Sequence, residues 1–298
     1  MSGDLHCHTR LSNGSMGIED IITLAKNKGV DVLAITDHDC QAGTVRAKII
    51  GERNGVRVIP GVELSAIDDK TGQVLHILCY LPDFPDRLEG LCHKNAAAAK
   101  RAAQYMMIKV SKLYPVTSDV IRRCAAGSTN LYEQHIMHAL MECGVTDGIY
   151  SAVYDMLFSP ESEHNIIVKP DYAPVKEVLE TIHAAGGIAV LAHPVEYRDD
   201  TLIERLLPLG LDGVEVWHPS ATKTESDELY AFCKKSKLLM TGGSDFRGMY
   251  NRTPLAPGDY GTPKTQLNEL LSFKGRQKRL AKKLAAEEDT AEAAASVR

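Results

Sequence analysis

Two histidines near the start of the chain are separated by a single residue, in the segment Asp4-Leu5-His6-Cys7-His8. In an extended chain, successive side chains point to opposite faces, so His6 and His8 would point to the same place. Imidazole is a common ligand of divalent metal ions in proteins. The spacing therefore predicts a metal site at the first strand, with Cys7 on the opposite face as a buried packing residue.

Further residues of metal-binding type follow later apolar runs of the chain. They are Asp37 and His38 after 30–36, Glu63 after 56–60, His76 within 73–80, His193 after 187–192 and Asp245 after 238–241. In parallel α/β folds, ligands gather at the carboxyl ends of the strands. Packing alone explains such a set poorly, because each unpaired polar group in a core costs several kcal/mol. We therefore interpret these residues as one polar site built from separate strands.

The elements that must position this site alternate between short apolar runs and helical patterns. Helices are expected over 18–28, 44–54 and 175–185, and strands over 30–36, 56–60, 73–80, 187–192, 214–217 and 238–241. This rhythm is typical of parallel βα units. Between about 85 and 165 helical patterns occur without a clear strand, beginning with the alanine-rich stretch 96–114. We expect a helical insertion there that caps the site.

Composition limits the classes of protein to consider. The 298 residues are 44% hydrophobic, which is enough for one large domain or a domain with an insertion. The net charge of −5 provides no basic surface for a nucleic-acid polymer. No apolar run reaches bilayer length, no signal pattern opens the chain, and seven cysteines without CxxC spacing argue against a disulfide framework. We expect a cytoplasmic protein that binds neither membranes nor nucleic-acid polymers.

Six short motifs occur in an order that is similar to that of a known family. They are the HxH pair, Thr36-Asp37-His38-Asp39, Pro60-Gly61-Val62-Glu63, Leu75-His76-Ile77, Ala192-His193-Pro194 and Gly243-Ser244-Asp245. Together they resemble the PHP (polymerase and histidinol phosphatase) superfamily of metal-dependent phosphoesterases, and they span nearly the whole chain. The insertion that precedes Val168-Lys169-Pro170-Asp171-Tyr172 resembles the branch of this superfamily that acts on small molecules.

The resemblance implies an α/β fold, a distorted (β/α)7 barrel of TIM-like type with an inserted helical cap. We expect 1–84 and 166–275 to form the barrel, 85–165 to form the cap, and 276–298 to form a charged C-terminal helix or tail. The implied activity is hydrolysis of a small phosphate ester to an alcohol and inorganic phosphate. A nucleoside monophosphate such as AMP, a sugar phosphate and a cyclic phosphate are the candidate substrates.

The resemblance also implies two divalent metal ions, which could be Mn, Fe or Zn because mixed imidazole and carboxylate ligands accept all three. One ion would be held by His6, His8, Glu63 and Asp245. Glu63 would bridge to the second ion, held also by His76 and His193. Two ions that share a carboxylate are the arrangement used for in-line displacement at phosphorus.

The sequence departs from the superfamily at a third metal site that many members have. Asn13 stands where Asp is common in the loop after HxH, and Arg247 stands where a His follows the GSD motif. Asn is a poorer ligand than Asp, and Arg stays protonated. We expect the third ion to be absent and the Arg247 guanidinium to contact phosphate in its place, unless Arg247 points into solvent.

Further candidates for catalysis and substrate binding rest on position alone or on the resemblance. Asp37 or His38 could protonate the leaving alkoxide or shuttle its proton. The candidate substrate contacts are Arg247, Lys169, His135, Arg198 and His218, of which Lys169 matches a lysine common in the small-molecule branch. Surface exposure or packing is the alternative role for each of these substrate contacts.

Rival functions make different demands on the same residues. An amidohydrolase also opens with HxH, but it usually needs a carboxylated lysine where this chain has Glu63. A nuclease or a proofreading module would need a basic groove to bind a nucleic-acid polymer, and the net charge of −5 argues against one. A non-catalytic metal-binding regulatory domain would show eroded ligands, and histidinol phosphate is a less favoured substrate because the insertion differs from that branch.

Overall fold

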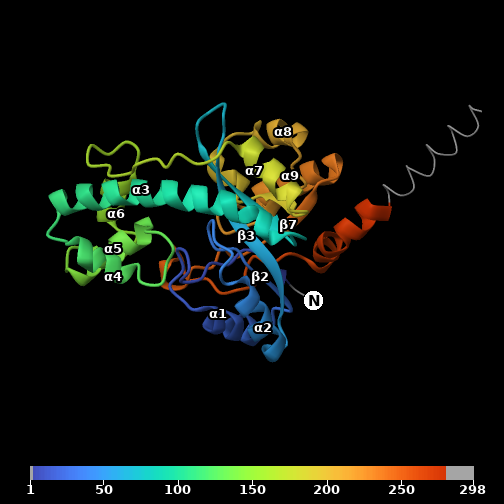
Figure 1. Ribbon diagram of the computed structural model, residues 1–298, viewed down its shortest axis with the longest axis horizontal. Helices are drawn as coiled ribbons and strands as arrows, with labels where there is room; N and C mark the ends of the chain where they lie inside the picture. The colour runs from blue at the N-terminus through green and yellow to red at the C-terminus, as the bar shows by residue number, and fades with distance from the viewer. Residues whose placement is uncertain (1–2, 280–298) are drawn as a thin grey trace, which may run out of the picture.

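A seven-stranded sheet, closed almost into a barrel, forms the centre of the computed structural model, which describes residues 3–279 (Figure 1). The strands lie in the sheet in sequence order: β1 (Gly3–Asp4), β2 (Val32–Ile35), β3 (Arg57–Ile67), β4 (Val74–Tyr80), β5 (Ile188–Leu191), β6 (Gly213–Trp217) and β7 (Leu239–Gly242). The backbone N–H of Leu5 donates to Gly242 O at 3.2 Å, and Cys7 pairs with Phe246. These contacts join the first and last strands and confirm the expected α/β barrel.

One strand departs from the parallel arrangement that the rhythm predicts. β4 runs antiparallel to both β3 and β5, while all other neighbours are parallel. β3 continues well beyond Pro60, so only residues 68–73 separate it from β4, whereas a parallel crossover needs a dozen or more residues. Because β4 is reversed, its amino end lies beside the carboxyl ends of its neighbours, and His76 there pairs with Ser65.

Helices cover the outside of the barrel. They are α1 (Ile18–Asn27), α2 (Thr44–Asn54), α7 (Val175–Ala184), α8 (Leu202–Leu206) and α9 (Lys223–Ser236). In Figure 1, α1 and α2 lie on one side of the strands and α7 to α9 on the other. A further helix begins at 264, and its Leu267 and Leu270 pack with Leu5 in the barrel interior. Of the predicted C-terminal segment, residues 280–298 lie outside the described part of the chain.

The insertion is helical and carries its own core. It contains the 3-10 turn η1 (Pro85–Leu88) and the helices α3 (Glu89–Leu113), α4 (Ser118–Cys124), α5 (Glu133–Glu142) and α6 (Ala152–Phe158). Figure 1 shows α4, α5 and α6 beside the outer part of α3, away from the strands. Leu91 near the start of α3 packs in the barrel core, whereas Val110 near its end packs in the core of the insertion. The 25-residue helix α3 thus links the two cores.

A buried asparagine fixes α3 to the barrel. Asn95 is fully buried, and its amide donates to Asp39 Oδ1 at 2.8 Å and to the backbone oxygen of Ser65 at 2.7 Å. Its own oxygen accepts from the backbone N–H of Ala173 at 3.2 Å. Since both polar atoms of this amide are engaged, Asn95 fixes the first part of α3 to the barrel. Within residues 3–279, no helix has the length and apolar character needed to cross a membrane.

Candidate metal centre

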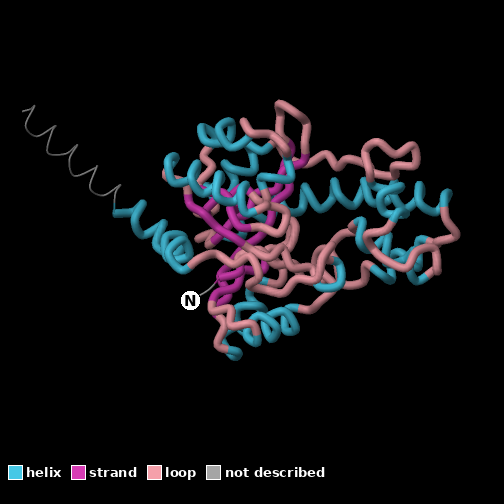
Figure 2. Tube along the Cα trace, turned by 180° about the vertical axis from the view of Figure 1, so that it is seen from behind, coloured by secondary structure: helices cyan, strands magenta, loops and turns pink. Residues whose placement is uncertain are grey.

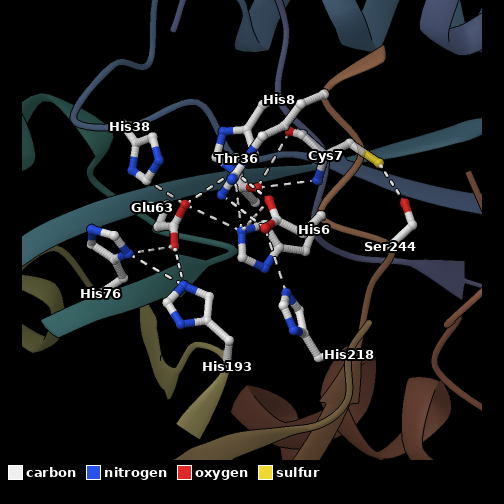
Figure 3. Close-up of polar contacts among 12 residues, drawn as sticks. His6, Cys7, His8, Thr36, His38, Glu63, His76, His193, His218 and Ser244 are labelled. Atoms are coloured by element: carbon white, nitrogen blue, oxygen red, sulfur yellow. Dashed lines mark hydrogen bonds and ion pairs between the residues drawn. The ribbon is translucent and has the colours of Figure 1, made fainter. Parts of the chain in front are cut away.

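Five imidazoles surround the buried carboxylate of Glu63 (Figure 3). Glu63 Oε2 lies 3.1 Å from His6 Nε2, 3.1 Å from His8 Nε2 and 3.2 Å from His38 Nδ1, and Oε1 lies 3.3 Å from His76 Nδ1 and 3.2 Å from His193 Nε2. Four of these five are the histidines that the sequence proposes as metal ligands. The fifth, His38, comes as close as they do, although the sequence suggests a proton-transfer role for it.

Asp245 completes this group on the side of the HxH pair. Its Oδ1 lies 3.1 Å from His8 Nε2 and 3.6 Å from His6 Nε2. Its Oδ2 forms an ion pair with Arg247 Nη2 at 2.7 Å and lies 3.5 Å from His218 Nε2. The structure therefore brings together all six residues that the sequence proposes as ligands and adds a guanidinium at their edge.

Local backbone geometry turns these side chains inward. Asp245 and His193 have φ values of 47° and 30°, in a left-handed region that non-glycine residues rarely adopt. Each follows the end of a barrel strand, and non-glycine residues with such strain cluster at functional sites. Gly243 lies so close to the HxH segment that a Cβ there would stand 2.3 Å from His6 Cβ. A glycine at this position allows the two chain segments to approach.

The HxH pair itself lies just beyond β1, in extended chain that pairs with its neighbours. The backbone N–H of His8 donates to Phe246 O at 2.9 Å, and that of Thr36 donates to Cys7 O at 2.8 Å. His6 and His8 both point to Glu63, whereas Cys7 is turned to the opposite face and is fully buried (Figure 3). The prediction for Cys7 is confirmed.

The spacing of the ligand atoms suits bound cations. His6 Nε2 lies 3.1 Å from His8 Nε2, and His76 Nδ1 lies 3.2 Å from His193 Nε2. Atoms bound 2.0–2.2 Å from one ion at tetrahedral or octahedral angles would stand about 2.8–3.6 Å apart. In the described residues, Asp245 Oδ1 has no hydrogen-bond donor. Nitrogens and oxygens that converge at these distances fit divalent metal ions.

The electrostatics of the cluster point the same way. Burial alone would raise the pKa of Glu63, but the imidazoles of His38, His6 and His76 hold it well below its usual range. Burial lowers the pKa of His76 to about 4, so its ring is neutral at neutral pH. Burial would also lower the pKa of His6, yet the carboxylates of Glu215 and Glu63 raise it well above the ordinary value, so without a metal ion this ring is protonated. The ionised Glu63 and the neutral His76 are in the states that metal binding requires, and an ion bound at His6 would displace the proton on Nε2.

Glu215 is a functional residue that the sequence reasoning missed. It lies on β6, fully buried, and accepts from His6 Nδ1 at 3.0 Å and from the backbone N–H of His193 at 2.9 Å. Because a carboxylate only accepts, the proton of His6 stays on Nδ1 and leaves Nε2 free to bind a metal. The available signal was a charged residue within the apolar run Gly-Val-Glu-Val-Trp, since Glu is rarely buried without a partner.

Asp37 does not face the cluster. Its carboxylate accepts from the backbone N–H and the hydroxyl of Thr9, both at 2.7 Å, and from the Ser12 hydroxyl at 2.5 Å. Ser12 Oγ also lies 3.3 Å from His8 Nδ1. Asp37 therefore orders the loop after His8, and its carboxylate is directed to Thr9 and Ser12.

A cavity of about 670 Å³ opens beside the cluster, between the barrel mouth and the insertion. Its lining includes the cluster residues His38, His76, His193, His218, Asp245 and Arg247, and the insertion residues Met106, Tyr132, Glu133, Tyr150 and Tyr154. Asn13 and the exposed Lys169 also lie on its wall. The Arg247 side chain is only 19% exposed and is paired with Asp245, so it points into this site and not into solvent.

Two proposed substrate contacts lie elsewhere. His135 is buried within the insertion, where its Nδ1 accepts from the backbone N–H of Tyr132 at 3.2 Å. Arg198 is exposed in a left-handed turn after η2 (Pro194–Tyr197). Neither side chain lines the cavity. Figure 2 shows many loop segments between the strands and the insertion, so following a strand does not by itself place a residue at the site.

The chain is similar to known proteins over most of its length. The PHP domain family matches residues 4–200. A phosphoribosyl 1,2-cyclic phosphate 1,2-diphosphodiesterase from Eggerthella lenta is 32% identical over 256 residues, 85% of this chain and 97% of that protein. A 5'-3' exoribonuclease from Haemophilus influenzae is 32% identical over 251 residues, 82% of this chain and 89% of that protein.

The fold of this chain is also similar to that of a solved structure. A protein from Bifidobacterium adolescentis, described as a metal-dependent phosphoesterase, superposes with a TM-score of 0.81 at 28% identity, covering 90% of this chain and 95% of that one. Its fold, the matched family and the names of the relatives point to the same chemistry. The chain belongs to the PHP family and is a metal-dependent hydrolase of phosphoric esters.

Proposed function

We propose that the substrate is a small phosphate ester of the size of a nucleoside monophosphate such as AMP, or a related sugar phosphate or cyclic phosphate. The observation that carries this proposal is the cavity between the Glu63 cluster and the insertion. Its volume of about 670 Å³ falls within the range of small-molecule sites. The similar enzyme from Eggerthella lenta is named for a cyclic phosphate of a sugar, which supports the same class.

Two divalent ions, Mn, Fe or Zn, are part of this proposal. His6, His8, Glu63 and Asp245 would hold the first, and Glu63, His76 and His193 the second. When bound, such ions polarise phosphoryl oxygens and make water a nucleophile at neutral pH. His38 and His218 also stand within the donor cluster, near Glu63 and Asp245 respectively, and could add to either set.

Arg247 is the residue that we assign to the phosphoryl group. Its guanidinium lies at the edge of the cluster, fixed by Asp245 at 2.7 Å, and lines the cavity. A fixed fork of N–H donors suits phosphate oxygens, and charge that grows on them in the transition state is stabilised without reorganisation. We propose that this guanidinium replaces the third ion found in many relatives, with Asn13 on the same cavity wall where they have Asp.

Proton transfer falls to His38 in this proposal, because the oxygens of Asp37 are engaged by Thr9 and Ser12. His38 lines the cavity, and burial lowers the pKa of its ring, so the ring holds a proton only transiently. Such a ring can take a proton from the attacking water and pass it to the leaving oxygen. Lys169 at the rim would contact the distal part of the substrate.

The remainder of the cavity supports a substrate with a ring. Tyr132, Tyr150 and Tyr154 of the insertion lie on its wall, and the Arg252 guanidinium stands 4.7 Å above the Tyr150 ring. Aromatic faces and guanidinium planes are surfaces on which a base or sugar ring stacks. A regulatory, non-catalytic role fits less well, because all six proposed ligands are present and converge.

A panel of substrates tests the proposal. Phosphate release is measured from AMP, ribose 5-phosphate and histidinol phosphate, and ring opening to a phosphomonoester is measured for sugar cyclic phosphates, each with Mn²⁺, Fe²⁺ or Zn²⁺. We expect hydrolysis of a nucleotide, a sugar phosphate or a cyclic phosphate. Absence of hydrolysis of every small ester would overturn the assignment.

A second candidate is the end of an RNA chain, because the Haemophilus influenzae relative is named as a 5'-3' exoribonuclease. A short RNA with a 5'-phosphate therefore belongs in the same panel. The net charge of −5 argues against a long RNA footprint, so we expect a lower kcat/KM for the RNA than for the best small ester. The reverse order would make RNA the substrate.

A further inference from the structure

A second group of metal-ligating side chains lies in the insertion, outside the Glu63 cluster. It consists of Cys124, the last residue of α4, with His138 and Glu142 of α5. One ligand atom of each residue lies within 4.8 Å of the others. His138 and Glu142 are four residues apart and so share one face of their helix, and Cys124 faces them from the neighbouring helix.

The two oxygens of Glu142 have separate environments. Oε2 forms an ion pair with Arg123 Nη2 at 2.6 Å. Oε1 lies 3.9 Å from His138 Nε2, and the Cys124 thiol is hydrogen-bonded to the same carboxylate. Arg123 thus orients Glu142 through one oxygen and leaves the other facing the imidazole and the sulfur.

Tyr250 orients the imidazole from its other side. The Tyr250 hydroxyl lies 2.9 Å from His138 Nδ1. When Nδ1–H donates to this oxygen, the lone pair of Nε2 is directed toward Cys124 and Glu142. Metal-binding histidines almost always have such a partner on the second nitrogen. Tyr250 is nearly fully buried, so the arrangement is fixed by packing and not only by the hydrogen bond.

The group is poorly suited to nucleophilic chemistry. Burial and the nearby Glu142 carboxylate raise the pKa of the Cys124 thiol to about 11, so the thiol is protonated at neutral pH. Reactive cysteines have lowered pKa values. A metal ion, in contrast, displaces the thiol proton on binding.

We propose that Cys124, His138 and Glu142 form a separate site for a divalent ion of the zinc class, with a water molecule completing the coordination. A thiolate with an imidazole selects zinc-like ions over Mg²⁺ or Mn²⁺, whereas the imidazoles and carboxylates around Glu63 accept Mn²⁺ as well. The side chains of His138 and Glu142 are 28% and 37% exposed, which leaves a path for the ion. An ion there would connect α4 to α5 and, through Tyr250, to the loop that carries Arg247.

Binding of Co²⁺ followed by absorption spectroscopy tests this site without reference to activity. A thiolate bound to Co²⁺ gives a charge-transfer band in the near ultraviolet. The proposed ligands of the Glu63 cluster are all imidazoles and carboxylates, and the Cys7 sulfur between His6 and His8 is turned away toward Ser244 Oγ at 3.8 Å (Figure 3). The band therefore reports the site in the insertion and not the Glu63 cluster.

We expect the band in the wild-type protein and its loss in Cys124→Ser. Cys143→Ser is the matched control, because Cys143 is an exposed thiol beside Glu142 and is not part of the group. Tyr250→Phe should weaken Co²⁺ binding about 10- to 100-fold. Glu142→Gln, an exposed substitution, should also weaken binding, and it keeps the proposal testable if Cys124→Ser does not fold. Absence of the band in the wild type, its persistence in Cys124→Ser, or its loss in Cys143→Ser would overturn the site.

Discussion

Replacing Glu215 by glutamine removes one acceptor from the group that orients the ligands. The carboxylate accepts simultaneously from His6 Nδ1 at 3.0 Å and from the backbone N–H of His193 at 2.9 Å. A glutamine side chain has one oxygen and one NH₂. If the oxygen faces His6, the NH₂ opposes the N–H of His193. If the oxygen faces His193, the proton of His6 must move to Nε2, where the lone pair for the metal would be lost.

The two orientations of the glutamine should lose a similar amount of free energy. One buried donor left without an acceptor costs about 1–3 kcal/mol. Substitution of residues that orient metal ligands typically lowers metal affinity about 10- to 100-fold, which is about 1.4–2.8 kcal/mol. Glu215→Gln should therefore bind Mn²⁺ about 10- to 100-fold more weakly than the wild type, with a normal fold because the two side chains have nearly the same volume.

Titration calorimetry of the metal-free protein with Mn²⁺ measures this difference. Glu177→Gln is the control, because the Glu177 side chain is exposed and forms a surface ion pair with Lys94 at 2.9 Å. Its Mn²⁺ affinity should equal that of the wild type. A folded Glu215→Gln protein with wild-type affinity would refute the view that Glu215 sets the tautomer of His6.

Two further predictions concern the guanidinium at the cluster and the attachment of the insertion. Arg247→Gln should lower kcat/KM about 10²- to 10³-fold without changing the number of bound Mn²⁺ ions, and a variant that instead gains an ion and keeps its rate would contradict the proposed role. Asn95→Ala removes the hydrogen bonds of the amide to Asp39, Ser65 and Ala173. Urea unfolding should show a loss of about 2–4 kcal/mol, against little change for the exposed neighbour Lys94→Ala.

Residue types and spacing were sufficient to predict the strands that carry ligands. His6, His8, Glu63 and Asp245 come from parts of the chain up to 239 residues apart, and each follows or lies in an apolar run of strand length. α2 runs over Thr44–Asn54 as predicted, because its glycine neighbours mark both ends. Such signals are local, so they can be read without knowledge of the fold.

The features that were missed depend on contacts between distant segments. The reversal of β4 follows from the length of β3, which runs through Glu63 to Ile67 and was predicted to end at Pro60. Whether Asp37 faces the cluster or Thr9 depends on the course of the loop after His8, and no spacing rule fixes that. His135 has the helical position expected of a cap residue, yet it is turned into the core of the insertion.

The central claim is that the Glu63 carboxylate joins the metal ions used for hydrolysis. It is tested most directly by Mn²⁺-dependent phosphate release from the ester that the wild type hydrolyses fastest, compared between the wild type and Glu63→Gln. The account predicts that Glu63→Gln, with a normal circular dichroism spectrum, releases phosphate only at the background rate. Release at the wild-type rate by that variant would contradict the account.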